Sequence, residues 1–443
     1  MNAMTEQHLD ALTPDELREA WDVLSEEERA EGFHALRRPD REDFFLECTS
    51  RDQAGLLASV PPGERRAWLR LLPPDDAADL VQLHPPEERE ALLALLDDVG
   101  RREVSALLAY AEDDAGGLMN PRFARVRPDM SVDEAIAYLR RQARDRVETI
   151  YYTYVLDMDQ RLLGVVSFRD LFAARPEQQV QDVMIRDLVS VRDDMDQEAV
   201  SRVFAQHDLL AVPVVDAQGR MQGLVTVDDI VDVVQEEATE DIQRMGGTEA
   251  LGAPYLTMPL ATVLRKRGVW LAVLFVGELL TATAMARYEE EIAQAVILAL
   301  FVPLIISSGG NSGSQATTLV IRAMALGEVR LRDWWRVARR ELASGLGLGV
   351  LLGALGVARI VGWEWAFGAY GPHALALGLT VGVSLVGVVL WGCMAGAMLP
   401  LLLRRVGLDP ASASAPFVAT LVDVSGVVIY FTVASSVLAG RLL

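Results

Sequence analysis

The sequence predicts a multidomain membrane protein with an all-α helical-repeat N-terminal domain, an α/β module made of a tandem repeat, and a five-helix α-helical transmembrane domain. Three observations predict this architecture. Proline pairs recur at twelve-residue intervals near the N-terminus, a 17-residue unit occurs twice in the middle, and five long apolar stretches follow residue 264. A bilayer core requires about 20 apolar residues in a helix, so each stretch is long enough to span it.

The charge is divided unevenly along the 443 residues. Before Arg265 there are 53 acidic and 27 basic residues, whereas 10 acidic and 14 basic residues follow from that point. The first region therefore has a net charge near −26 and the second near +4. A negative field of that size repels nucleic acid and attracts cations, although solubility alone explains acidic composition equally well. We therefore expect no nucleic-acid partner.

Residues 1–117 are predicted to form a superhelix of short helices. The pairs Pro61-Pro62, Pro73-Pro74 and Pro85-Pro86 each follow a short apolar run and precede acidic residues. Proline suits the first turn of a helix and prevents the preceding helix from continuing. Helices that begin at each pair would stack as a helical repeat.

Residues 118–181 and 182–240 are predicted to be two copies of one α/β unit. The matching segments are VLDMDQRLLGVVSFRDL (155–171) and VVDAQGRMQGLVTVDDI (214–230), with VRPDM (126–130) and VRDDM (191–195) upstream. Each copy is expected to contain a helix, a strand, a tight turn, a second strand and a helix. The expected strands are YYTYVL and LLGVVS in the first copy, and AVPVV and MQGLVT in the second.

Three positions of each copy indicate what the repeat is. Gly164, Ser167 and Asp170 of the first copy correspond to Gly223, Thr226 and Asp229 of the second. With these residues the repeat closely resembles a tandem pair of CBS domains, which bind adenosine ligands and regulate an attached domain. The resemblance implies a site for ATP in which Ser167 and Asp170 contact the ribose and Tyr152 stacks on the base.

The region 241–264 is predicted to be a connecting (plug) helix region between the CBS module and the membrane domain. The chain is acidic and helical in pattern from residue 233. It breaks at Gly246-Gly247 and resumes before the membrane. Its position indicates a connection between a regulator and the domain that it regulates.

The transmembrane domain, residues 265–443, is predicted to hold five helices. Their approximate ranges are 268–286, 292–321, 342–362, 374–403 and 415–440. Basic residues gather before the first span, between the second and third, and between the fourth and fifth. By the positive-inside rule the N-terminal domains are cytoplasmic and the C-terminus lies outside a bacterial-type plasma (inner) membrane. A broken second or fourth span is the alternative, and Pro303 with Gly309-Gly310 predicts a kink in the second.

Two acidic residues lie within predicted spans. Asp423 is the only charge in the last span, where a carboxylate costs on the order of a few kcal/mol unless it faces water or an opposite charge. It either lines a pathway for a cation or pairs with Arg322, the only nearby basic candidate. Glu278, in the middle of the first span, either serves the pathway or hydrogen-bonds between helices as a protonated acid.

Residues 301–329 form the most polar stretch at membrane depth. Hydroxyl and amide side chains crowd around three glycines, and they cannot all face lipid. A helix break at Gly309-Gly310 would expose carbonyl groups, which are good ligands for a hard cation. The alternative is a tight helix–helix interface of small residues with polar cross-links.

The two membrane motifs, GGNSGSQATTLVIRA (309–323) and PFVATLVDVSG (416–426), together with five spans and an upstream CBS pair, resemble the MgtE family of magnesium transporters and channels. The resemblance covers almost the whole chain. It implies a homodimer in the lipid bilayer, with a pore on the two-fold axis that the second and fifth helices line. The implied pore residues are Gly309, Gly310, Asn311 and Ala419, with the Mg²⁺ site at Asp423.

The resemblance also implies that the acidic cytosolic domains sense magnesium. Bound Mg²⁺ would bridge acidic surfaces and close the pore, and its loss would let the carboxylates repel one another. The implied ligands are Asp75 and Asp79 in the N-terminal domain, Asp196, Glu198, Asp208, Asp229 and Asp232 in the second CBS copy, Glu237, Glu240 and Asp241 in the connecting helix, and Asp409 before the fifth span. For any one of these acids, a solvated surface position is the alternative.

These features lead us to expect a Mg²⁺-selective channel or transporter that imports magnesium across the plasma membrane and is closed by intracellular Mg²⁺. One alternative is a divalent cation carrier or exchanger of the same fold. Another is a membrane-anchored CBS nucleotide sensor that transports no ion. The sequence shows no pattern of catalytic nucleophile and base, so we expect no enzymatic activity.

Overall fold

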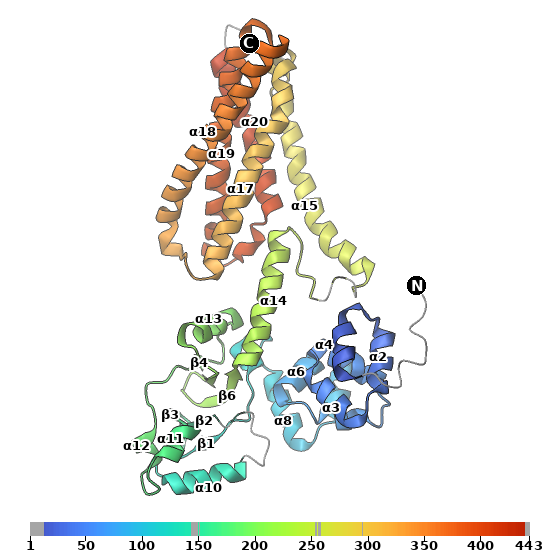
Figure 1. The fold of residues 1–443 in the computed structure, drawn as a ribbon, viewed down its shortest axis with the longest axis vertical. Coiled ribbons are helices and arrows are strands. Elements are labelled where there is room, and N and C mark those ends of the chain that lie inside the picture. The colour runs from blue at the N-terminus through green and yellow to red at the C-terminus, as the bar shows by residue number, and fades with distance from the viewer. Residues whose placement is uncertain are drawn as a thin grey trace. The chain divides into compact units, whose positions relative to one another are not determined.

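A computed structural model describes residues 13–142, 149, 151–252, 255, 258–294 and 296–438. The chain divides into two compact units, Met1–Glu237 and Ala238–Leu443. The first unit contains the N-terminal helices and both copies of the repeat, and the second contains the membrane helices (Figure 1). The three kinds of architecture expected from the sequence are therefore all present.

The N-terminal part of the first unit consists of short helices. They are α1 (Pro14–Ala20), η2 (Trp21–Val23), α2 (Glu26–Ala35), α3 (Arg38–Glu47), α4 (Ser50–Ser59), α5 (Arg65–Leu69), α6 (Pro74–Gln82), α7 (Pro86–Leu93), α8 (Asp98–Leu107) and α9 (Ala115–Leu118). Pro74 and Pro86 begin α6 and α7, as the proline pairs predict. The pair at 61–62 differs, because a turn follows it and α5 begins only at Arg65. Gly63 lies in that turn, and glycine favours turns over helix starts of this kind.

The two copies of the repeat form two three-stranded sheets and their flanking helices. The elements are β1 (Arg125–Val126), α10 (Val132–Gln142), β2 (Tyr152–Leu156), β3 (Leu162–Ser167), α11 (Phe168–Ala173), α12 (Val180–Val183), β4 (Val191–Arg192), α13 (Gln197–His207), β5 (Ala211–Val215), β6 (Met221–Thr226) and α14 (Val227–Met245). The four predicted strands are present. The two-residue strands β1 and β4, which pair in parallel with β2 and β5, were not predicted because they are too short to show a period.

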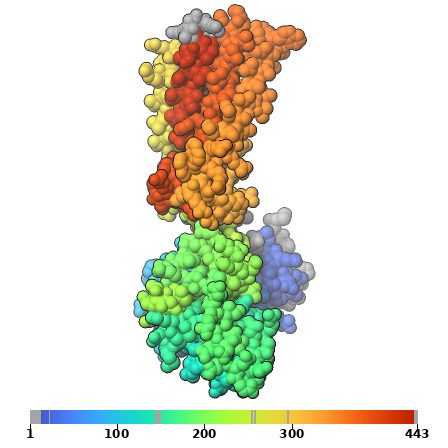
Figure 2. Space-filling view, turned by 90° about the vertical axis from the view of Figure 1, so that its left-hand side faces the viewer, coloured from blue at the N-terminus to red at the C-terminus, as the bar shows by residue number. Residues whose placement is uncertain are grey.

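The two sheets have the same topology, which agrees with the sequence repeat. Their orders are β1-β2-β3 and β4-β5-β6, and both hairpins shift register at the equivalent place, Val155/Leu156 and Val214/Val215. In the space-filling view the green atoms of the two copies form one continuous surface (Figure 2). The tandem copies therefore fold as one module.

The N-terminal helices and the second copy share one hydrophobic core. The rings of Phe33 and Phe45 lie 5.3 and 5.2 Å from the ring of Trp68, measured between centroids. The same cluster of buried side chains continues through Phe204 on α13 and Ile230 on α14. Residues of α6 and of the beginning of α14 both belong to this core, and both helices carry predicted metal ligands.

The connecting helix agrees with the helical pattern from residue 233, but it begins before the predicted region 241–264. Instead of occupying the predicted region 241–264, α14 begins directly after β6 and ends at Met245. Gly247 follows with φ of +74°, which supports the predicted break at the glycine pair. Residues 253–254 and 256–257 of the predicted region lie outside the described residues. The physical reason is that no helix-breaking residue separates Val227 from Met245, so the last helix of the second copy and the connecting helix are one element.

The second unit contains five helices long and apolar enough to span a membrane, as predicted. Its elements are α15 (Leu260–Ala286), α16 (Glu289–Gln294), η3 (Val296–Phe301), α17 (Val302–Ala325), η4 (Leu331–Asp333), α18 (Trp334–Phe367), η5 (Gly371–His373), α19 (Ala374–Arg405), η6 (Pro410–Ser412) and α20 (Ala415–Leu438). The first and third helices begin eight residues before their predicted starts, because polar turns extend them beyond the apolar stretch. Residue 295 and residues 439–440 of the predicted spans lie outside the described residues.

The helix break considered at Gly309-Gly310 is absent, because α17 is a continuous helix through both glycines. The change of conformation occurs earlier, where the 3₁₀ segment η3 meets α17 next to Pro303. The glycines instead let α17 approach α19 closely. A methyl group built at Gly392 on α19 would lie 2.4 Å from the carbonyl oxygen of Gly309. The alternative of a tight small-residue interface therefore describes this stretch.

Candidate metal sites

Three of the predicted pore residues lie together in the membrane unit. A methyl group built at Gly310 on α17 would lie 3.4 Å from Cβ of Ala419 and 3.5 Å from Oδ1 of Asp423, both on α20. Ala419 and Asp423 are four residues apart and so share one face of their helix. Because Gly310 has no side chain, the Asp423 carboxylate lies next to the backbone of α17.

The other two residues of the GGN segment are placed differently. Gly309 is buried, and a methyl group there would come within 2.4 Å of Val388 and 2.8 Å of Val422. It permits close packing rather than facing open space. Asn311 is exposed on the single chain, with its Nδ2 atom 3.5 Å from the hydroxyl oxygen of Ser307. Gly310 is therefore the member of the segment that meets Asp423.

Asp423 and Glu278 lie at membrane depth without a basic partner. Among the described residues neither carboxylate forms an ion pair, and the alternative Asp423–Arg322 pair is not formed. Helix α15 approaches α20 where a methyl group at Gly277 would lie 2.7 Å from Cγ2 of Thr420. Glu278 is the next residue and Asp423 is one turn beyond Thr420, so both acids lie near this crossing of α15 and α20. Such a pair of acids requires water, a proton or a cation nearby.

Asp79 lies at the centre of an acidic cluster in the first unit. Burial raises the pKa of its carboxyl to about 8, and the negative charges of Asp76, Glu112, Asp229 and Glu236 add to this effect. The cluster joins α6, the chain before α9, and α14. A divalent cation would relieve both the desolvation and the repulsion of these carboxylates.

Two of these acids were predicted as ligands, and three were missed. Asp79 and Asp229 were identified, whereas Asp76, Glu112 and Glu236 were not. A signal existed for Glu236, because it lies seven residues after Asp229 and therefore on the same helix face. Glu112 has no such signal, since only the tertiary fold brings it to the cluster.

Asp75 lies in a different environment from Asp79. It is 8% exposed and accepts a hydrogen bond of 3.1 Å from Nδ2 of Asn120. Asn120 exchanges backbone hydrogen bonds of 2.7 and 3.0 Å with Leu224 of β6. Asp75 therefore supports the contact between α6 and the second copy, and its role as a metal ligand stays a prediction.

The predicted ligands around α13 have local partners. Asp196 caps the helix by accepting two backbone N–H groups at 3.0 and 3.2 Å, and Asp208 ends it in the left-handed conformation with φ of 50°. Glu198 forms an ion pair of 2.7 Å with an arginine on the next turn. Gln197, which sequence reasoning missed, is buried and donates a hydrogen bond of 2.7 Å to Glu237 of α14. This contact fixes one predicted ligand of the connecting helix against α13.

The predicted adenosine residues are neighbours in the first copy. Tyr152 and Ser167 are directly opposite each other on β2 and β3. The Ser167 hydroxyl donates to Asp170 at 2.6 Å and accepts its backbone N–H at 3.1 Å, which caps α11. In the second copy the Thr226 hydroxyl donates to Asp229 at the same distance of 2.6 Å. The Ser/Thr–Asp pairs therefore have a structural capping role in both copies.

Asp229 and Asp232 begin the acidic face of α14. Burial raises the pKa of Asp229 to about 6 against the opposing effect of its hydrogen bonds from Thr226. Partial burial, and then the charge of Asp228, raises the pKa of Asp232. Both shifts disfavour the ionised form, so both carboxyls would gain from a nearby cation.

Three further predicted ligands gather around Arg244, a residue that sequence reasoning did not use. Its guanidinium donates to Asp409 and forms an ion pair with Glu240, and Asp241 adds a third negative charge. Partial burial lowers the pKa of Arg244, but Asp409, Glu240 and Asp241 outweigh it and raise the pKa. A signal existed in the sequence, because an acid four residues before a base is the favourable order for a helical ion pair.

The predicted ligands do not form a ready coordination site within the described part of the chain. No group of three or more His, Cys, Asp or Glu side chains there is arranged to hold a metal ion. The acids instead gather in separate places, around Asp79 in the first unit and around Arg244 in the second. A bound divalent cation would have to draw these carboxylates together.

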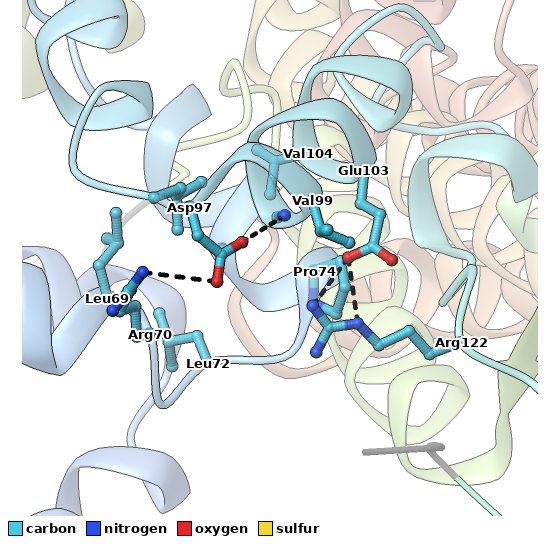
Figure 3. Close-up of a pocket in the computed structure, with 12 residues that line it drawn as sticks. Leu69, Arg70, Leu72, Pro74, Asp97, Val99, Glu103, Val104 and Arg122 are labelled. Atoms are coloured by element: carbon cyan, nitrogen blue, oxygen red, sulfur yellow. Dashed lines mark hydrogen bonds and ion pairs between the residues drawn. The ribbon is translucent and has the colours of Figure 1, made fainter. Parts of the chain in front are cut away.

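A cavity of about 450 Å³ lies in the first unit beside α5, α6 and α8 (Figure 3). Apolar side chains and the residues of two ion pairs line it. Arg70 is 3.5 Å from Asp97, and Arg122 is 2.7 Å from Glu103. None of the predicted metal ligands lines this cavity, so it is separate from the candidate metal sites.

Models of known protein families match most of the chain, apart from residues 237–301 and the two ends. The model of the MgtE divalent cation transporter matches residues 302–433, and the model of the MgtE intracellular N domain matches residues 12–113. The CBS domain model matches residues 115–177 and 180–236. The fold and these matches define a divalent cation transporter with an intracellular N-terminal domain and a CBS pair.

Individual relatives make the assignment more specific. The magnesium transporter MgtE of Thermus thermophilus is 45% identical over 340 residues, which cover 77% of this chain and 73% of that protein. The magnesium transporter MgtE of Enterococcus faecalis is 34% identical over 334 residues, which cover 75% and 71%. A crystal structure of the cytosolic domain of the Mg²⁺ channel MgtE in complex with ATP is 42% identical, covers 51% of this chain and 92% of that chain, and has a TM-score of 0.47.

The chain belongs to the MgtE family of magnesium transporters. It transports Mg²⁺ through a membrane-embedded domain, and its N-terminal domain is cytosolic. The expectation that it is not an enzyme is confirmed, because its homologues are magnesium transporters.

Proposed function

We propose that the chain forms a Mg²⁺-selective channel whose ion site is Asp423. The observation that carries this proposal is the position of the Asp423 carboxylate, beside the side-chain-free Gly310 and without an ion-pair partner among the described residues. Mg²⁺ dehydrates reluctantly and usually keeps several waters in its sites. A carboxylate that no basic side chain neutralises can bind the hydrated ion and release it again, as conduction requires.

A homodimer with Asp423 from each chain near the two-fold axis would complete this site. Two carboxylates balance the charge of one Mg²⁺ ion, and an isologous interface places identical residues opposite each other. The proposed orientation has the C-terminus outside a bacterial inner membrane. The membrane potential then favours import, because about 2.3 kcal/mol is gained per elementary charge for each 100 mV.

The direct test is Mg²⁺ uptake by vesicles that contain the Asp423→Asn variant. We expect uptake to fall at least to about a hundredth, because the neutral amide cannot attract a divalent cation in a low-dielectric site. Thr432→Val is the matched control on the same helix, since the Thr432 hydroxyl donates only within α20, to the carbonyl of Val428. Normal uptake by Asp423→Asn would show that the pore assignment is wrong.

We further propose that intracellular Mg²⁺ closes the channel by binding to the acidic cytosolic domains. The cluster around Asp79 supports this proposal, because burial and four neighbouring acids make its carboxylate costly to ionise without a cation. At low Mg²⁺ the repulsion among α6 and α14 carboxylates would favour separation. At high Mg²⁺ the bridged acids would hold α14 in the closed position.

We propose ATP as a ligand of the first CBS copy. Tyr152 and Ser167 are neighbours across two strands, and Asp170 is held by the Ser167 hydroxyl at 2.6 Å. This arrangement offers an aromatic face and a carboxylate to a nucleoside. Isothermal calorimetry with ATP should give a saturable heat that Asp170→Ala removes, and an absence of heat with the unmodified chain would exclude this site.

A carrier or exchanger mechanism is the alternative for transport. The positions of Glu278 and Asp423 near the crossing of α15 and α20 favour it, because two neighbouring carboxylates can couple the binding of one cation to that of another. Single-channel recordings distinguish the mechanisms, since a carrier gives no resolvable unitary current. A membrane-anchored nucleotide sensor without transport is excluded by family membership, because the relatives are transporters.

A further inference from the structure

The end of α14 is attached to the membrane helices by contacts that involve no metal. The Arg244 guanidinium donates to Oδ2 of Asp409 and pairs with Oε1 of Glu240. Asp409 in turn accepts the backbone N–H of Ala411 at 2.9 Å, and Ala411 is buried in η6. Because η6 leads directly into α20, a displacement of Arg244 reaches the N-terminus of the helix that carries Asp423.

A second set of contacts holds the chain that follows α14 in the same place. A methyl group at Gly247 would lie 2.7 Å from Nε1 of Trp270, on α15, and 3.1 Å from Pro416, at the start of α20. Lys266 on α15 donates to two carbonyl groups of the loop after α14, and Gln243 accepts a hydrogen bond of 2.6 Å from the same loop. The end of α14 therefore has a defined position against two membrane helices.

We propose that Arg244 is a positioning residue that couples α14 to α20, and that it acts as a permanent cation among carboxylates that were expected to bind magnesium. The inference rests on the proposed gating function, because it concerns how closure reaches the pore. An ion entering between Glu240 and Asp409 would have to displace the guanidinium. Mg²⁺ therefore acts at acids nearer the start of α14, such as Asp229 and Glu236, and Arg244 transmits the resulting movement.

The chemistry of arginine suits this role. The guanidinium is planar, is always charged and offers five N–H donors, so it can hold one carboxylate on its own helix and another on η6 at once. Charge-assisted hydrogen bonds of this kind are about twice as strong as neutral ones. A lysine could satisfy the charge but would not hold two carboxylates in fixed directions.

The test compares Mg²⁺-dependent closure in full-length Arg244→Gln with that of the unmodified chain in vesicles. We expect uptake at low internal Mg²⁺ to persist, and the internal Mg²⁺ concentration needed for half closure to rise at least about ten-fold, which is a typical coupling factor between linked sites. Arg244→Lys should give an intermediate shift. Arg38→Gln is the matched control, because Arg38 forms an i,i+4 ion pair of 3.1 Å within α3 of the first unit.

Protease protection by Mg²⁺ separates this inference from the proposed gating. We expect Mg²⁺ to protect the cytosolic domains of Arg244→Gln normally while uptake stays open, because sensing is intact and only its transmission is lost. Closure at the unmodified concentration in Arg244→Gln would overturn the inference. An unmodified chain that neither closes nor gains protection with Mg²⁺ would overturn the proposed gating instead.

A double-mutant cycle keeps the inference testable if Arg244→Gln folds poorly. The cycle compares Arg244→Lys, Asp409→Asn and the double variant by the Mg²⁺ concentration needed for half closure. If Arg244 acts through Asp409, the fold-shift of the double variant should equal the larger of the two single fold-shifts rather than the product of the two. Independent, multiplicative shifts would show that Arg244 does not act through Asp409.

Discussion

At the scale of single residues, the chain places carboxylates where their charge is costly. Asp79 is half-buried among acids, Asp423 lies inside a membrane span, and Glu278 lies on the neighbouring helix α15. Costs of this kind persist in a protein when a ligand offsets them. For all three residues, therefore, a bound ligand would offset the cost of the charge, although Asp79 is in the cytosolic unit and the other two are in the membrane unit.

The raised pKa of Asp79 predicts a pH-dependent stability. Its pKa is about 8 in the folded chain against 3.8 ordinarily, so the folded state binds more protons than the unfolded state between these values. The contribution of Asp79 to stability is therefore complete below about pH 4 and is lost as the pH rises to about 8. Asp79→Asn should stabilise α6 at pH 7 by on the order of 2–4 kcal/mol in Mg²⁺-free buffer.

Hydrogen exchange of α6 backbone amides in the full chain measures this effect between pH 5 and 8. Asp98→Asn on α8 is a suitable control, because Asp98 is exposed. The control should leave the pH dependence of α6 protection unchanged. Equal pH dependence in the unmodified chain and in Asp79→Asn would contradict the electrostatic account of the cluster.

The adjacent glycines 309 and 310 should respond differently to alanine. Gly309→Ala would bring a methyl group within 2.4 Å of Val388. Such overpacking lowers the free energy of unfolding by about 1–3 kcal/mol, so we expect the unfolding temperature of the membrane unit to fall by several degrees. In Gly310→Ala the added methyl group would lie 3.4 Å from Cβ of Ala419, which is an ordinary contact, so we expect normal stability. We expect reduced Mg²⁺ uptake, because the methyl group would lie beside the Asp423 carboxylate. Thermal unfolding in detergent and vesicle uptake measure the two effects, and the reverse pattern would contradict the assigned roles.

At the scale of secondary-structure elements, the long and strongly patterned parts were predictable and the contacts between them were not. The five spans and the four longer strands follow from apolar length and from the internal repeat. The two-residue strands carry no period, and the glycines of the GGN segment pack against α19 and α20 within an unbroken helix. A sequence cannot reveal that packing partner.

The candidate sites show the same division. The spacing of Glu237, Glu240 and Asp241 is enough to predict that they lie on or near one face of a helix. That spacing does not reveal that Gln197 contacts Glu237, or that Arg244 links Glu240 to Asp409. These contacts join distant elements, and the residue types involved are common on protein surfaces.

Helix α14 should lose magnesium sensitivity when its acids are neutralised together. We expect a chain with Glu237→Gln, Glu240→Gln and Asp241→Asn to close less readily with Mg²⁺. The Mg²⁺ concentration that half-protects its cytosolic domains from protease should rise about ten-fold. A triple change of the exposed residues Glu26, Glu27 and Glu31 on α2 removes the same charge and serves as the control. Unchanged protection in the α14 triple variant would remove this helix from the sensor.

At the scale of the whole molecule, the cytosolic and membrane parts differ in charge as they differ in function. About −26 of formal charge precedes the membrane domain, which is itself near +4. A field of this sign concentrates divalent cations around the cytosolic unit, and salt screens it over about 10 Å at 0.1 M. Composition therefore suits the cytosolic unit to cation sensing, and apolar length suits the other unit to the bilayer.

The strongest whole-molecule prediction concerns the number of chains that form one pore. If Mg²⁺ binds between two Asp423 carboxylates related by a two-fold axis, a dimer that contains one Asp423→Asn chain should transport poorly. Equal co-expression of both chains yields unmodified dimers in a fraction of about one quarter, so uptake should fall to about a quarter of the unmodified value. Uptake near one half would mean that each chain transports alone. Co-expression of the unmodified chain with Thr432→Val is the control. It should leave uptake unchanged, because Thr432 lies away from the proposed site and every dimer keeps both Asp423 residues.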